Sequence, residues 1–377
     1  MKRFWDWCKT EAVLCIAVLL AVASAVFVTP DQQYLEYIDF RTLGILVCLM
    51  AIMAGLQKIG IFHFVAEWML ERVQHMRGVV FVLIMLCFFS SMFITNDVAL
   101  ITFVPFTFIV LKLVFPEESG KLVVSIVVMQ TIAANLGSML TPIGNPQNLY
   151  LFGKASLTFV EFLVLMLPYT ALSLILLILW CLVFPYHGPS KLQLDFKTRT
   201  MLKGTGKRFF VYILLFALCL LTVSHIVPWI VTLLVVVLAV LFVDRSILRE
   251  VDYALLLTFV GFFVFIGNMG RIPAFYNMLQ RIISGNEVLT SVISSQFISN
   301  VPAALLLSGF TNQYAALIVG TNLGGLGTLI ASMASLISFK YIGREYKHLR
   351  KNYFWYFTIA NILFLAMLLL LEFIKNS

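Results

Sequence analysis

Residues 95–100 read Thr-Asn-Asp-Val-Ala-Leu, and in the second half of the chain residues 299–304 read Ser-Asn-Val-Pro-Ala-Ala. Each copy precedes a second stretch that contains asparagine, at residues 135–142 and 322–329. A hydroxyl-Asn pair inside an apolar segment is costly, because its surroundings offer polar groups few partners. Its repetition in the same order predicts two halves that build one site, which is the pattern of a secondary transporter with internal repeats.

The composition excludes a soluble domain. The chain has 377 residues, of which 61% are hydrophobic and 12% are charged, whereas a soluble domain has about 25% charged residues. Apolar stretches of about 20 residues recur along the chain, and each is long enough to cross a bilayer as a helix. The alternation of polar and apolar residues that marks a membrane β-barrel is absent. We therefore predict an all-α polytopic membrane protein.

The net charge of +8 does not indicate a nucleic-acid partner, because the basic residues fall in loops between apolar segments. The six cysteines are dispersed and show no metal or disulfide spacing. The five histidines lack a ligand spacing, and no nucleophile-base arrangement stands out. We expect a transporter in the cell (inner) membrane, with no enzymatic activity and no cofactor other than Na⁺ as a coupling ion.

The placement of basic residues also predicts the topology. Lys2, Arg3 and Lys9 precede an apolar run at 12–28, which places the N-terminus in the cytoplasm and makes this run the first span. Ala23-Ser24-Ala25 would also suit signal-peptide cleavage, but the repeat needs this helix. A basic linker at 185–208 is predicted to be cytoplasmic, and the C-terminus external.

Two inverted repeats account for the remaining pattern. Ile38-Asp39-Phe40 opens one span and Val251-Asp252-Tyr253 opens its counterpart, and the charge rule makes the first run inward and the second outward. Residues 58–77 mix charge with apolar side chains, as an interfacial helix does. We expect about nine spans and two re-entrant hairpins. The boundaries are 1–184 for the first repeat (hairpin 78–114, broken helix 121–153) and 209–377 for the second (hairpin 288–310, broken helix 314–339).

Specific residues predict the breaks in the two helices and the tips of the two hairpins, which lie at 95–97 and 299–301. Pro142, Gly144 and Pro146 interrupt one apolar run, because each proline removes a donor and clashes with the preceding turn. Gly324, Gly325 and Gly327 interrupt the other. For the first hairpin, the alternative is two full spans with Asp97 in an outer loop.

Where tips and breaks meet, helix N-termini can hold an anion, and carbonyl and hydroxyl oxygens can bind Na⁺. The alternative is that the polar side chains only bridge helices. The candidate residues for substrate or ion binding are Thr95, Asn96, Asp97, Asn135, Thr141, Gly144, Asn145, Gln147, Asn148, Ser299, Asn300, Asn322 and Thr328. Of these, Asn96, Asp97 and Asn300 are the candidate Na⁺ ligands.

Asp97 is the only residue of the Asp, Glu, Lys, Arg and His types between Gly78 and Leu111, and its counterpart in the second half is the neutral Val301. A carboxyl group in apolar surroundings favours its protonated form unless a bound cation holds it ionised. Asp97 is therefore a candidate Na⁺ ligand, a candidate proton carrier or a cap on the following helix.

These segments resemble the ion transporter superfamily, which includes divalent anion/Na⁺ symporters, citrate transporters, arsenite permeases and Na⁺/H⁺ antiporters. The tips at 95–97 and 299–301 are similar to the Ser-Asn-Thr signatures of the symporters. Residues 141–148 resemble the break motif of the branch with citrate transporters and arsenite permeases, and small bacterial permeases in particular. The third tip position departs from the signature, with Asp97 in one copy and Val301 in the other.

The resemblance implies an elevator mechanism, in which hairpins and broken helices move against a scaffold that forms a homodimer. The chain is expected to lack a leading pair of spans and any dimer contacts that such a pair makes. We predict a secondary active transporter of a small anion, a di- or tricarboxylate, coupled to Na⁺ or H⁺. The alternatives are a Na⁺/H⁺ antiporter, an arsenite or oxyanion efflux permease, and a purely structural or pore-forming membrane protein.

Overall fold

The protein is described from a computed structural model, which covers residues 11–114, 120–184 and 205–376. These residues form helices and turns without a strand, which confirms the all-α prediction. Eight of the helices are long and apolar enough to cross a membrane. The helices are α2 (Ala12–Phe27), α3 (Gln33–Tyr37), α4 (Phe40–Lys58), α5 (Ile61–Leu70), α6 (Met76–Ile94), α7 (Asn96–Val114), α8 (Gly120–Ser138), α9 (Pro146–Lys154), α10 (Phe159–Val183), α11 (Gly206–Val223), α12 (Trp229–Asp244), η1 (Arg245–Arg249), α13 (Tyr253–Gly270), α14 (Pro273–Ile283), α15 (Glu287–Ile298), α16 (Asn300–Ser308), α17 (Tyr314–Leu323), α18 (Met333–Glu345), η2 (Lys347–Leu349) and α19 (Arg350–Asn376).

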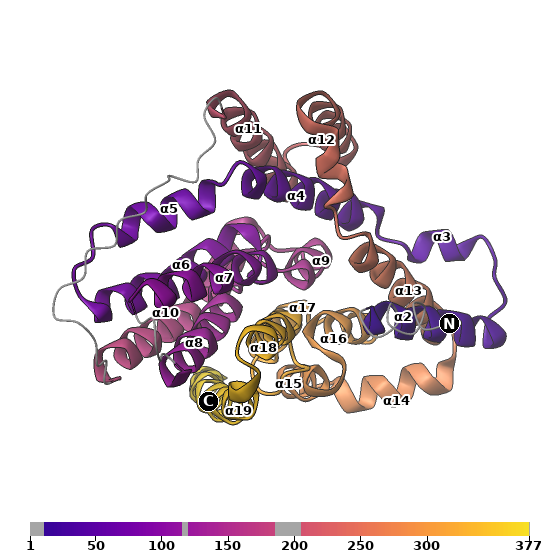
Figure 1. Ribbon diagram of the computed structural model, residues 1–377. Helices are drawn as coiled ribbons and strands as arrows, with labels where there is room; N and C mark the ends of the chain where they lie inside the picture. Colours follow the sequence, from indigo (N-terminus) through magenta and orange to yellow (C-terminus); the bar gives the residue numbers. More distant parts are fainter. Residues whose placement is uncertain (1–10, 115–119, 185–204, 377) are drawn as a thin grey trace.

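The helices form groups that draw on both halves of the chain (Figure 1). Helices α6 to α10 lie together on one side, and α15 to α19 lie next to them. Helix α4 crosses the molecule and packs against α11 and α12, while α13 packs along α2. Each half therefore supplies a compact bundle and long helices that border it.

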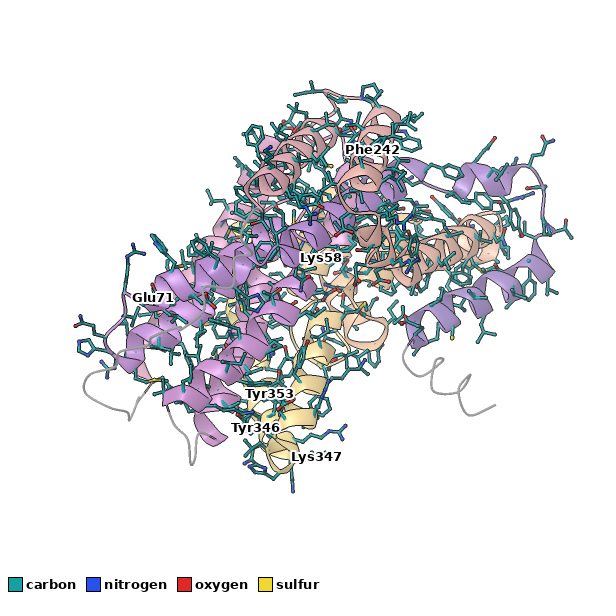
Figure 2. All side chains as sticks on the ribbon, turned by 45° about the horizontal axis from the view of Figure 1, so that its top comes forward. Lys58, Glu71, Phe242, Tyr346, Lys347 and Tyr353 are labelled. Atoms are coloured by element: carbon teal, nitrogen blue, oxygen red, sulfur yellow. The ribbon has the colours of Figure 1, made fainter. Side chains whose placement is uncertain are left out.

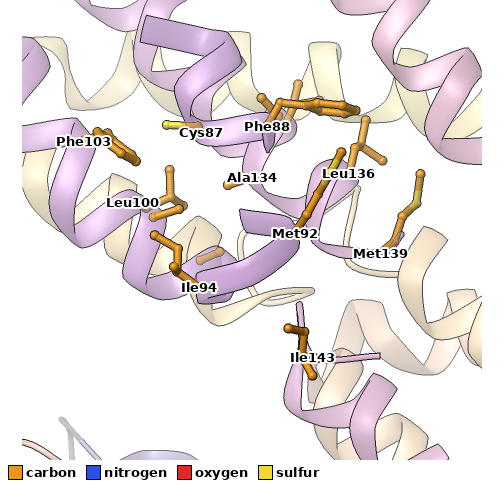
Figure 3. Packing of buried hydrophobic residues seen from close by; sticks show 14 of the residues in the cluster. Cys87, Phe88, Met92, Ile94, Leu100, Phe103, Ala134, Leu136, Met139 and Ile143 are labelled. Carbon is orange, nitrogen blue, oxygen red and sulfur yellow. The ribbon is translucent and has the colours of Figure 1, made fainter. Parts of the chain in front are cut away.

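The most extensive packing joins α6 to α8. Phe88 and Met92 of α6 lie beside Leu136 of α8, and all three are buried (Figure 3). Gly137 permits this approach, because a Cβ atom there would lie 1.9 Å from the carbonyl oxygen of Phe88. The first tip and the first break are thus mounted on one packed unit.

The tips share one backbone conformation. Thr95, between α6 and α7, has φ 69° and ψ 152°, and Ser299, between α15 and α16, has φ 72° and ψ 155°. A non-glycine residue in this region is strained by about 1–3 kcal/mol and persists only where its surroundings enforce it. At both positions, this single residue separates the end of one helix from the start of the next.

The longer interruptions end alike as well. Helix α8 ends at Ser138 and α9 begins at Pro146, while α17 ends at Leu323 and α18 begins at Met333. The residue before the second helix is extended in both, with φ −145° and ψ 145° at Asn145 and φ −144° and ψ 141° at Ser332.

Some predicted boundaries differ from the observed ones. Helix α11 begins at Gly206, so Lys207 and Arg208 lie on a helix; residues 185–204 of the predicted linker lie outside the described residues. Helix α18 continues to Glu345, past the predicted end at 339. These helix ends carry charged residues, which a hydropathy signal does not include. The predicted nine spans counted α2, whose 16 residues make it shorter than the eight candidate spans.

Large apolar side chains are exposed along the spans. Phe242 of α12 is 88% exposed and lies at the outer edge of the molecule (Figure 2). In a bilayer such side chains contact acyl chains rather than water. The exposed apolar surface of the spans is therefore suited to contact a membrane.

We predict that Gly137→Ala destabilises the protein by about 3 kcal/mol, because the new methyl group meets backbone that cannot rotate away. The melting temperature of purified protein in detergent measures the effect. Gly270→Ala is the matched control, since nothing lies within 4 Å of a Cβ atom there. Equal melting temperatures for the two variants would contradict the packing described for α6 and α8.

Candidate functional site

Four helix N-termini meet at one small cavity. Helices α7, α9, α16 and α18 each begin with residues that line it. Its volume of about 10 Å³ is close to the minimum needed for one water molecule or small ion. The lining residues are Asn96, Asp97, Asn145, Pro146, Gln147, Leu255, Asn300, Val301, Ser332 and Met333.

Asn135 of α8 connects the first tip to the second break. Its Oδ1 accepts hydrogen bonds from Asn96 Nδ2 at 2.9 Å and from Ser332 Oγ at 3.0 Å. Its Nδ2 donates to the carbonyl oxygen of Gly325 at 3.5 Å. One amide thus joins elements from both halves of the chain.

Asn322 of α17 makes the reciprocal connection to the first break. Its Nδ2 donates to Asn148 Oδ1 at 2.6 Å, and its Oδ1 accepts from Asn145 Nδ2 at 3.4 Å. Asn145 Nδ2 also donates to Ser138 Oγ at 2.8 Å. Asn148 Nδ2 lies 3.3 Å from the Thr141 carbonyl oxygen, so the side chains also hold the break itself.

The second tip is held by backbone contacts. The Asn300 amide donates to the carbonyl oxygen of Ala331 at 2.9 Å, and Ser299 Oγ lies 3.4 Å from the same oxygen. Asn300 also lies against Gly325, where an added Cβ atom would be 3.1 Å from its Nδ2. The tip therefore packs directly on the break between α17 and α18.

Several polar atoms at this cavity have no hydrogen-bond partner within the described chain. They are Asp97 Oδ1, Asn145 Oδ1 and both side-chain heteroatoms of Gln147. Asn145 and Gln147 are 3% and 1% exposed. Leaving such a group unpaired costs about 1–3 kcal/mol, so these atoms are suited to contact a ligand.

A larger cavity of about 620 Å³ adjoins the small one. Thr95, Asp97, Asn145 and Pro146 line it on one side, and apolar residues of α4 line it on the other. It also receives three more charged side chains, those of Lys58, Glu250 and Asp252. Asp252 has a second role, because its carboxylate accepts from the Leu255 amide and caps α13.

Lys58 is held at this cavity by an ion pair. Its Nζ lies 2.7 Å from Asp244 Oδ2 and 2.6 Å from Ser246 Oγ. The larger cavity therefore has three carboxylates, those of Asp97, Glu250 and Asp252, and one lysine that is already paired.

The structure brings most of the predicted residues together. Asn96, Asp97, Asn145, Gln147 and Asn300 line the small cavity. Asn135, Asn148 and Asn322 support it through the hydrogen bonds above. The three candidate Na⁺ ligands share this cavity, but Asn96 uses its Oδ1 to accept from the Asp97 amide.

Of the other five predicted residues, Thr95 lines only the larger cavity and Ser299 lines neither of the two. The remaining three lie apart from both cavities. Thr141 donates to the Met92 carbonyl at 2.5 Å, and Gly144 packs on the Ser138 carbonyl, which lies 2.1 Å from where its Cβ atom would be. Thr328 is exposed and donates to the Gln296 carbonyl at 3.1 Å. These residues shape the breaks and do not face the cavity.

Sequence reasoning missed Ser138, Ser332 and the contribution of Leu255 to the cavity wall. A single serine among small residues is a weak signal, although the position of Ser332 before α18 matches that of Asn145 before α9. Gln296 of α15 bonds across the second break, because its Nε2 donates to the carbonyl oxygens of Gly324 and Leu326 at 3.1 and 3.0 Å.

The chain resembles known proteins both in its family and in individual relatives. Residues 5–316 match the family model CitMHS, described as citrate transporter. An uncharacterized transporter of Methanocaldococcus jannaschii, MJ0456, is 34% identical over 87% of each chain. The inner membrane protein YbiR of Escherichia coli is 30% identical over 86% of each chain. The silicon efflux transporter LSI3 of rice, Oryza sativa, is 29% identical over 42% of this chain and 31% of its own length.

We predict that Asn135→Ala lowers the free energy of unfolding by about 1–3 kcal/mol, because Asn96 and Ser332 lose their buried acceptor. Denaturant or thermal unfolding in detergent measures the change. Asn361→Ala is the matched control: Asn361 is equally buried, but its Nδ2 bonds only to its own helix and its Oδ1 has no partner within the described chain. If the two variants lose the same stability, Asn135 is not a connection between the halves.

Proposed function

The chain belongs to the citrate transporter family, and we propose that it carries a small anion, a di- or tricarboxylate, together with Na⁺ or H⁺. The family makes it a multi-pass membrane transporter and not an enzyme. The relative YbiR is an inner membrane protein, and we place this chain in the cell membrane as well.

The proposal rests on the four helix N-termini at one cavity. Each helix N-terminus carries about half a positive charge, and its first amides lack intrahelical acceptors. Among the described residues that line the small cavity, none is lysine or arginine. An anion would therefore be held by amides and helix dipoles, as phosphates are at helix N-termini elsewhere.

Asp97 gives this arrangement its coupling. Asp97 lies in the first turn of α7, and the N-terminus of this helix would attract the anion. The ionised Asp97 carboxylate and a bound anion would repel each other strongly in apolar surroundings. The anion therefore binds well only when Asp97 holds a proton or a Na⁺ ion. The two solutes would then move together.

The cavity sizes suggest a division of roles. A volume of about 10 Å³ suits the coupling ion beside Asp97, with Asn300 as a second ligand. The cavity of about 620 Å³ lies within the range of small-molecule sites, about 300–1,000 Å³. It would hold the body of the anion, with an acidic group at the N-termini of α7 and α9, which line both cavities. Asp97, Asn145 and Pro146 line both, so substrate and ion would share these residues.

We further propose that the chain consists of inverted repeats that work as an elevator. The matched backbone angles at Thr95 and Ser299, and at Asn145 and Ser332, support the repeat. Helices α15 and α16 have 12 and 9 residues, and at 1.5 Å per residue neither crosses a bilayer, which supports a re-entrant hairpin. Helices α6 and α7, with 19 residues each, have the length for either a hairpin or two spans.

Two ion pairs in equivalent positions support a revised boundary between the two repeats. Asp31 follows α2, accepts from the amide two residues later and pairs with Arg271 at 2.7 Å. Asp244 is the last residue of α12. Its carboxylate also accepts from the amide two residues later, and it pairs with Lys58 at 2.7 Å. We therefore match α2 with α12, which places α11 between the repeats. In the elevator, α6 to α10 and α15 to α19 would move against the other helices, which would form the dimer scaffold.

A second candidate is a Na⁺/H⁺ antiporter. The observation that favours it is the charge of the larger cavity, where three carboxylates oppose one paired lysine and would attract cations. The partial likeness to a silicon efflux transporter keeps oxyanion efflux as a third candidate.

Uptake into proteoliposomes distinguishes these functions. We expect labelled citrate or a dicarboxylate to accumulate when Na⁺ or H⁺ is higher outside, with saturation and no accumulation when the gradient is collapsed. Proton movement on addition of Na⁺ alone would instead identify an antiporter. Unsaturable uptake independent of any gradient would contradict active transport.

We predict that Asp97→Asn abolishes the dependence of transport on the Na⁺ or pH gradient. An amide cannot take up the proton, and it carries no charge to hold Na⁺; each loss of about 1.4 kcal/mol in ion contacts weakens ion binding by roughly tenfold. Glu36→Gln, an exposed carboxylate on α3, is the control and should keep wild-type coupling. Wild-type coupling in Asp97→Asn would leave Asp97 only a capping role.

A further inference from the structure

A third cavity, of about 570 Å³, lies between α10, α15, α17 and α19. Its lining residues do not overlap with those of the two cavities at the site. The proposed transport cycle gives it no role. Its polar lining includes Tyr169, Glu287, Glu372 and Lys375.

The cavity gathers charges of both signs. Glu287, the first residue of α15, is 9% exposed, and its Oε1 accepts from Thr311 Oγ1 at 3.3 Å. Glu372 accepts from the hydroxyl of Tyr169. Lys375 Nζ lies 5.3 Å from the centre of the Tyr169 ring. Two carboxylates and one ammonium group therefore lie in one cavity near the end of a membrane span.

The rim of the cavity is apolar and belongs to the membrane surface. Leu289 and Phe373 are 51% and 71% exposed, and α10, α15 and α19 lie along one edge of the molecule (Figure 1). Lys375 is in the last turn of α19, after a long apolar run. A basic residue at a helix end lies at the level of the lipid headgroups. A ligand of this cavity therefore meets polar groups at one end and acyl chains at the other.

We infer that this cavity binds a phospholipid whose headgroup has a primary ammonium and a phosphate, as in phosphatidylethanolamine. The ammonium would donate to Glu287 and Glu372, and the phosphate would pair with Lys375. A choline headgroup lacks the N–H donors that the carboxylates accept. An anionic headgroup meets a net negative cavity, since two carboxylates outnumber one lysine.

Native mass spectrometry of the purified full-length protein tests this inference with added phosphatidylethanolamine, phosphatidylcholine and phosphatidylglycerol of the same acyl chains. We expect phosphatidylethanolamine to be retained roughly fivefold better than phosphatidylcholine, because an ammonium that donates to these carboxylates adds a charged hydrogen bond. Equal retention of the two, or preferential retention of phosphatidylglycerol, would overturn the inference.

Single substitutions test which side chain contacts the ammonium and which contacts the phosphate of the headgroup. Glu287→Gln should reduce the retention of phosphatidylethanolamine to that of phosphatidylcholine, whereas Lys375→Met should weaken both, since both carry the phosphate. Lys375 is exposed, so its variant tests the site even if Glu287→Gln fails to fold. Lys351→Met, at the opposite end of α19, is the matched control and should retain wild-type preference. Unchanged retention in Lys375→Met would also overturn the inference.

Discussion

The lack of hydrogen-bonding solvent in a bilayer is the constraint on which this structure depends. A helix that stops inside the membrane leaves amides or carbonyls without partners, and each costs several kcal/mol in hydrocarbon. Four helices of this chain begin in its interior, at Asn96, Pro146, Asn300 and Met333, and all four begin at the same small cavity. Buried asparagines donate to carbonyl oxygens of the breaks, such as those of Thr141 and Gly325. Among the described residues, no side chain caps the N-termini of α9, α16 and α18. Gathering the helix ends in one place concentrates positive helix ends where an anion can use them.

The hydrogen bonds that close this arrangement cross between the halves of the chain. Asn135 serves the first tip and the second break, while Asn322 reaches back to the first break. Neither half satisfies its own polar groups alone. The halves are nevertheless unequal, because Asp97 faces the cavity where the second copy has Val301. This inequality is what makes coupling to a cation a specific proposal for one residue rather than a property of a symmetric site.

The sequence was sufficient for much of this description. The lengths of apolar runs predicted the helices, and the duplicated hydroxyl-Asn pairs predicted which residues would meet. The resemblance to citrate transporters was confirmed by the family match. Helix ends such as that of α18 extended further than predicted, because charged residues beyond the bilayer give no apolar signal. Thr328 lies outside the small cavity, and the sequence could not show this because composition does not reveal which way a side chain in a break points. Ser332 was missed because a lone serine gives little signal in the sequence. Only the structure shows that it precedes α18 as Asn145 precedes α9.

If the two halves build one site, the contact between Asn148 of α9 and Asn322 of α17 couples their contributions to stability. A double-mutant cycle with Asn148→Ala and Asn322→Ala compares the unfolding free energies of both single variants and the double variant. The 2.6 Å hydrogen bond predicts an interaction energy of about 0.5–3 kcal/mol between the two positions. Additive losses, with an interaction energy near zero, would contradict a site shared by the two halves.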